Sequence, residues 1–485
     1  MNILLASSEV FPYSKTGGLA DMVGALGKAL AADGHAVTIV TPLYRSVREK
    51  HPQIELTDKT ITLPLGGLTV SAKVWSTTPL EGLTVLFVDQ PEFFDRPALY
   101  GEGGRDYPDN AARFIFFSKA VADLARNAPD PFEALHVHDW QVGLVPLFVR
   151  YGERSGTWDN PPATIITIHN LAFQGVFLYS DFLLTNLPND YFATNGVEFY
   201  NQMNCLKSGI VFSDMITTVS PRYAREIMTE VYGCGLDGVI RARQERLVGI
   251  LNGVDYSEWN TETNPLLRFN YSISDFTGKT RQKAALQAEM GLPVDPSIPL
   301  FGTISRLADQ KGIDIAITAL EEMLATRMQF VVLGSGDPEF ERGFRRLQER
   351  YPDRVCARIG YDHGLSHRIE AGCDFFLMPS RFEPCGLNQM YSLRYGTIPI
   401  VRVTGGLDDS VTDITEHPED ADGIKFYEYS ARALAKAIRK ALALFENKEL
   451  LDHFRRNGMN VDYSWEHTTH EYEAVYRRAQ QLKQL

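Results

Sequence analysis

The stretch from Ser380 to Gln389, with the sequence SRFEPCGLNQ, contains the residues best suited to chemistry. It follows the apolar run 373–378, which is typical of a buried parallel strand, and precedes 390–395, which is typical of a helix. Glu383 is therefore predicted between a strand end and a helix start, where open α/β sheets bind ligands. Gly386 would let the backbone approach a ligand, and the N–H groups of the helix start favour hydroxyls or phosphates. On its own, the pattern fits a Glu383 side chain that caps the helix equally well.

Two cations flank another strand-to-helix turn in the same half of the chain. Arg306 and Lys311 lie in the sequence SRLADQKG, which follows a predicted strand at 300–305. Arginine offers a planar fork and lysine a point charge, a pair suited to a diphosphate. Tyr361 follows a further strand and can stack on a flat base, and Thr404 opens a Thr-Gly-Gly-Leu turn with N–H donors. Because such turns follow successive strands, a shared ligand cleft is favoured over unrelated surface turns.

The first half of the chain has a glycine-rich loop of its own. The sequence KTGGLAD at 15–21 lies between a predicted strand at 2–8 and a predicted helix at 20–32. Two glycines at a helix start, with Lys15 beside them, suit phosphate binding, although a plain tight turn fits as well. The loop matches neither a dinucleotide fingerprint nor a P-loop, and the Gly-Lys-Thr at 278–280 lacks the earlier glycine of a Walker motif.

Polar residues also end two later strands of the first half. Asp139 is suited to binding hydroxyls, and His169 is placed to face a ligand. His136 and His138 share one side of a strand, but no further metal ligand is evident nearby. The Asp-x-Asp at 420–422 lies in an acidic segment typical of a surface loop. We therefore expect no essential metal and no cofactor.

Length and composition indicate a two-domain α/β protein. The 485 residues exceed one ordinary core, and strands and helices alternate at the spacing of parallel sheets. With 48 Lys and Arg against 61 Asp and Glu, the net charge of −13 argues against nucleic acid or an anionic membrane as the main partner. The 5 scattered cysteines suggest reduced thiols. No signal peptide or bilayer-length apolar run is evident, so we expect a soluble cytoplasmic protein.

Five motifs in order give the chain a close, end-to-end resemblance to the bacterial glycogen synthases, the ADP-glucose-using relatives of plant starch synthases. They are KTGGLAD at 15–21, HDW at 138–140, SR-x-x-x-QKG at 305–312, SRFEPCGL at 380–387 and TGGL at 404–407. The resemblance implies a GT-B fold, in which two doubly wound Rossmann-like domains face a deep cleft and the last helix crosses back to the first domain. It also implies glucose transfer from ADP-glucose to the non-reducing end of an α-1,4-glucan such as glycogen or a malto-oligosaccharide, with retention. A UDP-glucose-dependent GT-B transferase and a catalytically silent glucan-binding protein are the alternatives.

The resemblance also implies roles for individual residues. The catalytic group it implies is Glu383, Arg306, Lys311 and His169, with both cations on the diphosphate. The nucleotide-sugar-binding set is Lys15, Gly18, Asn252, Tyr361, Cys385, Gly386, Leu387 and Thr404. The acceptor side is formed by Asp139, Tyr100 and Asp21. The wider superfamily has a second glutamate at a position that is Tyr391 here, so a ribose-binding carboxylate is not expected there.

The expected domains are 1–255 on the acceptor side, 256–460 on the nucleotide-sugar side, and a C-terminal helix at 461–485 that packs on the first domain. Residues 54–88 are predicted to add a hairpin and a strand to the first sheet, and polar residues 255–264 to form the linker. The glycine-rich stretch 100–106 is expected to be a flexible loop over the cleft. For retention, the resemblance favours attack on one face of the sugar, with Glu383 holding hydroxyls rather than acting as nucleophile.

Overall fold

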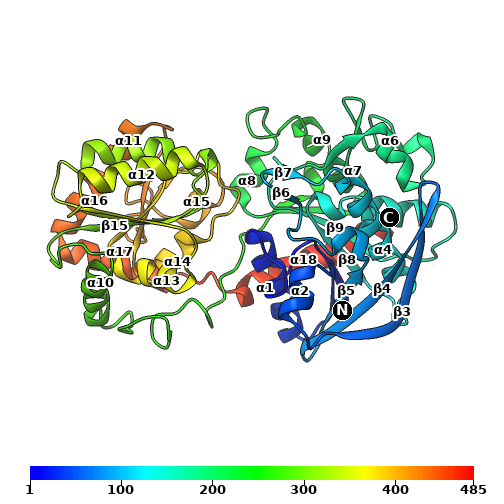
Figure 1. Ribbon diagram of the computed structural model, residues 1–485, viewed down its shortest axis with the longest axis horizontal. Coiled ribbons are helices and arrows are strands. Elements are labelled where there is room, and N and C mark those ends of the chain that lie inside the picture. Colours follow the sequence, from blue (N-terminus) through cyan, green and yellow to red (C-terminus); the bar gives the residue numbers. More distant parts are fainter. Residues whose placement is uncertain (485) are drawn as a thin grey trace. The chain divides into compact units, whose positions relative to one another are not determined.

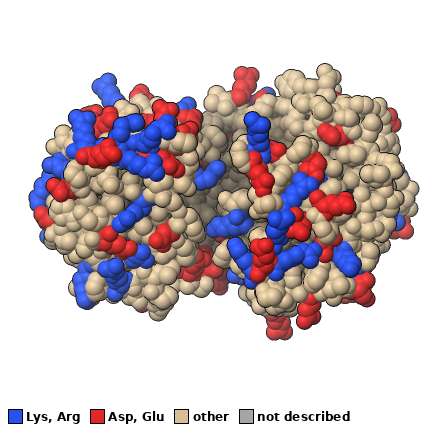
Figure 2. All heavy atoms as spheres, viewed as in Figure 1, with Lys and Arg blue, Asp and Glu red and all other residues tan. Residues whose placement is uncertain are grey.

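The computed structural model describes residues 1–484 and divides into two compact units, each an α/β assembly (Figure 1). The first comprises residues 1–219 and 224–253 together with the segment that begins at 465, and the second comprises 220–223 and 254–464. The C-terminal helix α18 (Trp465–Gln484) thus packs with the first unit, where it contacts α1 and β9. Among the described helices, none has the length and hydropathy needed to cross a bilayer. In the view of Figure 2, basic and acidic side chains are interspersed over the surface.

A nine-stranded sheet with the order β14-β13-β9-β8-β1-β2-β5-β4-β3 is the centre of the first unit. All neighbours pair in parallel except β3–β4 and β4–β5, so residues 54–88 form the predicted hairpin and strand. The strands are β1 (Asn2–Ala6), β2 (Ala36–Pro42), β3 (Glu55–Leu65), β4 (Leu68–Leu80), β5 (Leu83–Asp89), β8 (Ala134–His138), β9 (Ala163–Ile168), β13 (Met215–Thr218) and β14 (Leu247–Gly249). The main helices are α1 (Gly18–Ala32), α4 (Asn110–Arg126), α5 (Val145–Arg154) and α7 (Cys205–Phe212), with α18. Strand β9 is buried along its whole length, as expected where helices cover both faces of a parallel sheet.

The second unit has a fully parallel sheet with the order β17-β16-β15-β18-β19-β20. Its strands are β15 (Leu300–Ile304), β16 (Gln329–Gly334), β17 (Val355–Ile359), β18 (Phe375–Met378), β19 (Ile398–Arg402) and β20 (Ile424–Phe426). The helices are α10 (Thr277–Glu289), α11 (Ile313–Met323), α12 (Pro338–Arg350), α13 (His363–Gly372), α14 (Asn388–Arg394), α15 (Gly405–Ser410), α16 (Ala431–Glu446) and α17 (Lys448–Asn460). The predicted helix at Lys311 begins two residues later, because Asp309–Lys311 is a 3-10 turn that ends at Gly312.

Alternate residues of these strands enter two separate cores. Phe301, Phe330 and Phe375 pack with α11, α12 and α16 on one face of the sheet. Their neighbours Val331 and Phe376 pack with α10 and α13 on the other face. Because successive side chains of a strand point to opposite faces, a strand covered on both sides must be apolar throughout. This explains why a central strand such as β18 appears in the sequence as a continuous apolar run.

Each sheet has one point where the strand order reverses, and ligands bind at such points in open α/β sheets. In the first unit, β1 lies between β2 and β8, so the loops after β1 and β8 diverge there. In the second unit, β15 lies between β16 and β18, and the loops after β15 and β18 diverge in the same way. These four loops contain most of the site residues predicted from the sequence.

Two connecting segments differ from expectation. The stretch 100–106, which was predicted to be a flexible loop, contains a two-stranded hairpin of β6 (Gly101–Glu102) and β7 (Arg105–Asp106). Its turn is made by two glycines with φ of 60° and 77°, a backbone region that few other residues adopt. The polar stretch 255–264, where the linker was predicted, packs onto the second unit. Its Trp259 stacks on Tyr391, with ring centroids 3.6 Å apart, and on His367 at 4.0 Å.

Candidate active site

A buried ion pair lies at the reversal point of the second sheet. Lys311, in the turn after β15, donates to Glu383, in the loop after β18, with Nζ and Oε2 separated by 2.5 Å. The Glu383 side chain is 7% exposed and the Lys311 side chain 21%. Ser380 donates a second hydrogen bond to the same oxygen at 3.1 Å. The sequence predicted both charged residues, and the structure adds their direct contact, which holds the lysine ammonium in one place.

A cavity of about 330 Å³ opens beside this pair. Its walls are the ends of β15, β16, β17 and β18 and the turns that follow them. Five predicted residues line it, namely Arg306, Lys311, Tyr361, Gly386 and Leu387. Arg306 and Tyr361 are exposed, Tyr361 by 83%, so both present polar or aromatic groups that a ligand can contact. One wall of the cavity thus carries two cations and another carries a flat ring.

Two glycines allow the loops behind this cavity to come close. Gly386 has a φ of 71°. At Gly405, with a φ of 44°, an added Cβ would lie 1.9 Å from the carbonyl oxygen of Glu383. Both positions therefore exclude other residues for conformational or steric reasons. The Thr-Gly-Gly-Leu turn serves as a support that fixes the Glu383 loop in position.

The role predicted for that turn as a source of N–H donors is wrong for two of its residues. The Gly406 N–H donates to the carbonyl oxygens of Glu383 and Pro384, both at 3.1 Å, and the Leu407 N–H donates to Thr404 at 3.2 Å. Backbone groups engaged in this way are not available to a ligand. Thr404 is fully buried, and Cys385 is 6% exposed, so both lie behind the cavity rather than on its surface.

At the reversal point of the first sheet, the glycine-rich loop already holds a carboxylate. Glu9, which the sequence analysis missed, is 3% exposed and accepts hydrogen bonds from the N–H groups of Thr16 and Gly17. The Thr16 hydroxyl donates to its other oxygen at 2.6 Å. Of the two interpretations left open for this loop, phosphate binding therefore cannot use these two N–H donors. The only signal for Glu9 was an acidic residue soon after a predicted strand.

Other predicted residues surround this carboxylate. The Tyr100 hydroxyl donates to Glu9 at 2.6 Å and contacts the Ser8 hydroxyl at 2.7 Å. Lys15 and Asp21 form an exposed ion pair at 2.7 Å. Gly18 begins α1, and a Cβ added there would meet nothing within 4 Å. Since no packing explains that glycine, close approach of a ligand remains a physical reason for it.

Asp139 has a strained backbone conformation and a raised pKa. Its φ of 61° and ψ of −172° fall in a region that is nearly restricted to glycine, at a cost of about 1–3 kcal/mol. Its carboxylate accepts the His169 N–H at 2.7 Å. Burial raises the pKa of Asp139 to about 7, aided by the nearby negative charge of Glu9 and opposed by the N–H donors of His169 and Asn170. Strain and perturbed acidity at a strand end are typical of a functional site.

The histidines of this region are neutral. Burial lowers the pKa of His169 to about 3 and that of His136 to about 3. His169 Nε2 lies 3.1 Å from His138 Nδ1, so one of the two donates to the other. His136 bonds to Thr167 at 2.6 Å and to Tyr476 at 2.9 Å. A neutral His169 can exchange hydrogen bonds with hydroxyls without bringing a charge.

Metal-binding arrangements do not include these predicted residues. Among the described residues, two groups of histidine and acidic side chains approach closely enough to share an ion, namely Glu258 with His363 and His367, and Asp33 with His470 and Glu473. His136 and His138 belong to neither group.

Asn252 follows β14 in the first unit and is 6% exposed, and its buried Oδ1 has no hydrogen-bond partner among residues 1–484.

The elevated pKa of Asp139 predicts a specific dependence of stability on pH. Between the ordinary aspartate pKa of about 3.9 and about 7, the folded chain keeps a proton that the unfolded chain has released. The contribution of Asp139 to stability is therefore lost as pH rises through about 7. Asp139→Asn removes this titration. The melting temperature of the variant should therefore rise relative to that of the wild type as the pH increases from about 3.9 to about 7. Thermal unfolding at a series of pH values measures the difference, with exposed Asp106→Asn as control, and a constant difference would contradict the prediction.

Comparison with known proteins identifies the family of this two-unit arrangement. Residues 2–242 match the family model of the starch synthase catalytic domain, and residues 291–461 match that of the glycosyl transferases group 1. A glycogen synthase from Koribacter versatilis is 45% identical over 485 residues, covering 100% of this chain and 99% of the relative. A glycogen synthase from Myxococcus xanthus is 48% identical over 480 residues, covering 98% of this chain and 99% of the relative.

The chain belongs to the glycogen and starch synthase family. It is similar to the catalytic domain of starch synthase IV from Arabidopsis thaliana bound to ADP and acarbose, with a TM-score of 0.90, 33% identity and 99% of each chain covered. A sucrose-phosphate synthase from Thermosynechococcus elongatus, with a TM-score of 0.60 and 19% identity over 98% of each chain, shares the fold. The predicted GT-B fold is thereby confirmed. The family makes the protein a glucosyltransferase of glycogen elongation.

Proposed function

We propose that the protein transfers glucose from ADP-glucose to the non-reducing end of an α-1,4-glucan, with retention at the anomeric carbon and without a metal ion. The observation that carries the proposal is the cavity beside the Lys311–Glu383 pair, which has Arg306 and Tyr361 in its walls. Cations suit a diphosphate, a flat ring suits a base, and a buried carboxylate suits sugar hydroxyls. The starch synthase relative that binds ADP and acarbose supports this choice of ligands.

Breaking the bond between sugar and diphosphate leaves negative charge on the leaving group. In the proposed mechanism, Arg306 and Lys311 bind the departing diphosphate more tightly than the intact donor and thereby lower the barrier. Their charges perform the task that a metal ion performs in other phosphate-transfer sites. The restraint of Lys311 by Glu383 reduces the rearrangement needed at the moment of reaction, which is the condition for strong electrostatic stabilisation.

Glu383 is proposed to hold sugar hydroxyls rather than to form a covalent bond. Its Oε2 already accepts from Lys311 and Ser380, whereas no hydrogen bond to Oε1 is found among residues 1–484. A carboxylate offers about four lone-pair sites, so acceptor capacity remains for hydroxyls. The acceptor would then attack on the face that the diphosphate leaves, with the leaving phosphate taking the proton of the attacking hydroxyl. A trapped glucosyl adduct on Glu383 would contradict this mechanism.

The acceptor glucan is proposed to bind the first unit near the strained Asp139, Tyr100 and Asp21, while neutral His169 is proposed to hold the glucosyl ring. These groups provide hydrogen-bond donors and acceptors with little net charge, which suits an uncharged polysaccharide. Gly18 and Asn252 are proposed to contribute to the donor from the same unit.

A comparison of donors tests the proposed reaction. ADP-glucose or UDP-glucose, each labelled in the glucose, is supplied with glycogen, and label in the polymer is counted. The proposal expects incorporation from ADP-glucose at a clearly higher rate. Faster incorporation from UDP-glucose would favour the other type of GT-B transferase. Absence of both incorporation and ADP release would indicate a glucan-binding protein without catalysis.

Removal of the exposed ring at Tyr361 should weaken donor binding. Stacking of a base on an aromatic side chain contributes about 1–3 kcal/mol, which is roughly a 5- to 150-fold effect. We expect Tyr361→Ala to raise the KM for ADP-glucose within this range while the melting temperature stays near that of the wild type, because the ring is 83% exposed. Tyr427→Ala, at a tyrosine that is 66% exposed in the same unit, is the matched control. An unchanged KM would exclude the stacking role.

A further inference from the structure

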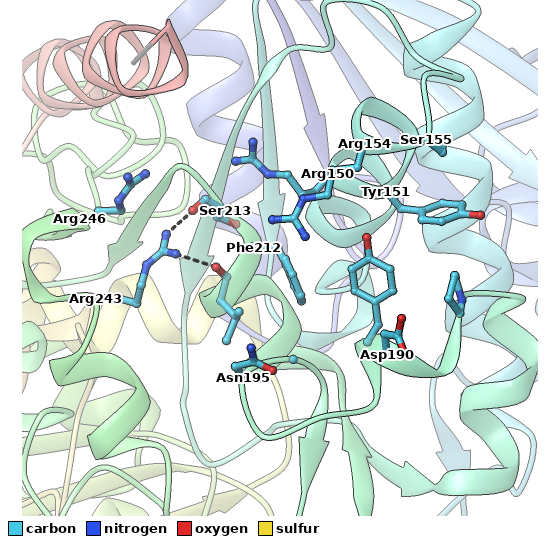
Figure 3. Close-up of a pocket in the computed structure, with 14 residues that line it drawn as sticks. Arg150, Tyr151, Arg154, Ser155, Asp190, Asn195, Phe212, Ser213, Arg243 and Arg246 are labelled. Carbon is cyan, nitrogen blue, oxygen red and sulfur yellow. Dashed lines mark hydrogen bonds between the residues drawn. The ribbon is translucent and has the colours of Figure 1, made fainter.

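A second and larger cavity, of about 640 Å³, lies in the first unit (Figure 3). None of the residues assigned to the reaction lines it. Its walls come from the end of α5, the segment 188–196, the end of α7 and the residues just before β13 and β14. In a parallel sheet, helices end where the next strands begin. The cavity therefore lies at the amino edge of the sheet, opposite the carboxyl edge where Asp139 and His169 lie.

Four arginines line this cavity, namely Arg150, Arg154, Arg243 and Arg246. Arg243 donates to the carbonyl oxygens of Val211 and Ser213, as Figure 3 shows, and Arg246 donates to that of Asp214 at 3.0 Å. A carbonyl oxygen fixes a guanidinium without neutralising it. Arg154 is exposed and has no ion-pair or hydrogen-bond partner among the described residues. The cavity therefore keeps a large part of its positive charge.

Acidic groups around the cavity do not balance this charge. Arg150 pairs with Glu153 and with Asp214, both at 2.9 Å. Among the described residues, Asp190 is the one acidic side chain in the cavity wall. Lys483 adds a further cation close to Arg150 and Asp214. Burial, aided by the like charges of Arg246 and Arg150 and opposed by the negative charge of Asp214, lowers the pKa of Arg243 to about 10. In a chain with a net charge of −13, such a gathering of cations requires an explanation.

The remaining wall suits the uncharged part of a ligand. Tyr151 and Tyr191 lie edge to face, with ring centroids 5.9 Å apart, and Tyr191 and Phe212 are also 5.9 Å apart. In Figure 3, Arg243 and Arg246 lie on one side of the cavity, and Tyr151 and Asp190 lie on the other. Ser155 and Asn195 add groups that exchange hydrogen bonds with hydroxyls.

We propose that this arginine cavity binds a small phosphorylated sugar, with the phosphate on the arginines and the sugar against the tyrosine rings. Arginine forks match phosphate oxygens in pairs, and aromatic faces are a suitable surface for the apolar side of a sugar ring. Hydrogen bonds to carbonyl oxygens at helix ends explain only part of the cluster, because Arg154, in the last turn of α5, has no hydrogen-bond partner among the described residues. The site is separate from the reaction centre, and the proposal does not depend on the identity of the glucosyl donor.

Calorimetric titration of the full chain with inorganic phosphate, ribose 5-phosphate and ribose tests the proposal. The titrations use the Arg306→Gln background, so that phosphate binding at the donor cavity is weakened. We expect ribose 5-phosphate to bind more tightly than phosphate, and ribose to bind weakly or not at all. Loss of a charged hydrogen-bond donor should weaken ribose 5-phosphate binding about 10-fold or more, both in Arg154→Gln and in the double variant with Arg246→Gln.

Arg126→Gln, at an exposed arginine on α4 outside the cavity, is the matched control and should bind like the background. Arg154 is exposed, so its single variant remains informative if the double variant fails to fold. Unchanged affinity in Arg154→Gln would overturn the proposal. So would equal binding of ribose and ribose 5-phosphate, or no binding of either phosphate compound at millimolar concentration.

Discussion

Glu383→Ala is expected to lower the rate of glucosyl transfer on the order of 10³-fold. The substitution removes the proposed acceptor for sugar hydroxyls and also frees Lys311, whose ammonium contacts this carboxylate at 2.5 Å. Misplacement of a substrate by about 1 Å can by itself lower the rate about 10²-fold, and loss of an oriented charge lowers the rate further. Incorporation of labelled glucose from ADP-glucose into glycogen, in the variant and the wild type, measures the effect. A rate within about tenfold of wild type would refute the role of Glu383.

Glu383→Gln separates the two possible roles of this carboxylate. The amide keeps an acceptor oxygen for hydroxyls but is a very poor nucleophile. If Glu383 positions the sugar, the glutamine variant should lose clearly less activity than the alanine variant. If Glu383 forms a covalent intermediate, both variants should lose activity to a similar extent. Circular dichroism and the melting temperature confirm that each variant is folded before rates are compared.

Lys311→Met should lower kcat by about 10²–10³-fold, as removal of one preorganised donor to developing charge does in other enzymes. Methionine preserves much of the length of the side chain and removes its charge, so the test addresses electrostatics rather than shape. Because the lost interaction strengthens as the diphosphate departs, kcat should fall more than the affinity for ADP-glucose.

The matched control for this prediction is Lys436→Met, at an exposed lysine on α16, which should leave kcat unchanged. Lys311→Met also leaves the Glu383 carboxylate without its cation, so the melting temperature of this variant must be measured together with its rate. A change confined to KM would show that Lys311 binds the donor equally in ground and transition states, which contradicts the proposed mechanism.

The sequence predicts the second unit well because both faces of its sheet are covered. Strand β18 is apolar throughout and β16 is apolar after Gln329, and each is followed by a turn rich in glycine or charge. The strand order seen in the structure then places the loops after β15 and β18 together, which brings Lys311 to Glu383. Periodicity and turn chemistry are local properties, and they suffice where the site consists of residues that directly follow strands.

Properties that arise from packing were not predictable in this way. The Glu9 carboxylate binds the glycine-rich loop through contacts that no local pattern encodes. The strain and raised pKa of Asp139 depend on burial and on His169, which follows a different strand. The Thr-Gly-Gly-Leu turns look alike in sequence, yet one holds a carboxylate and the other packs against the backbone of Glu383. Identical local signals acquire different roles from their tertiary neighbours.

A crystal structure of the protein soaked with ADP tests the central claim most directly. The account predicts that the diphosphate contacts Arg306 and Lys311 in the cavity of about 330 Å³, with the adenine ring on Tyr361. ADP bound at a place remote from Arg306 and Lys311, with this cavity left empty, would contradict it.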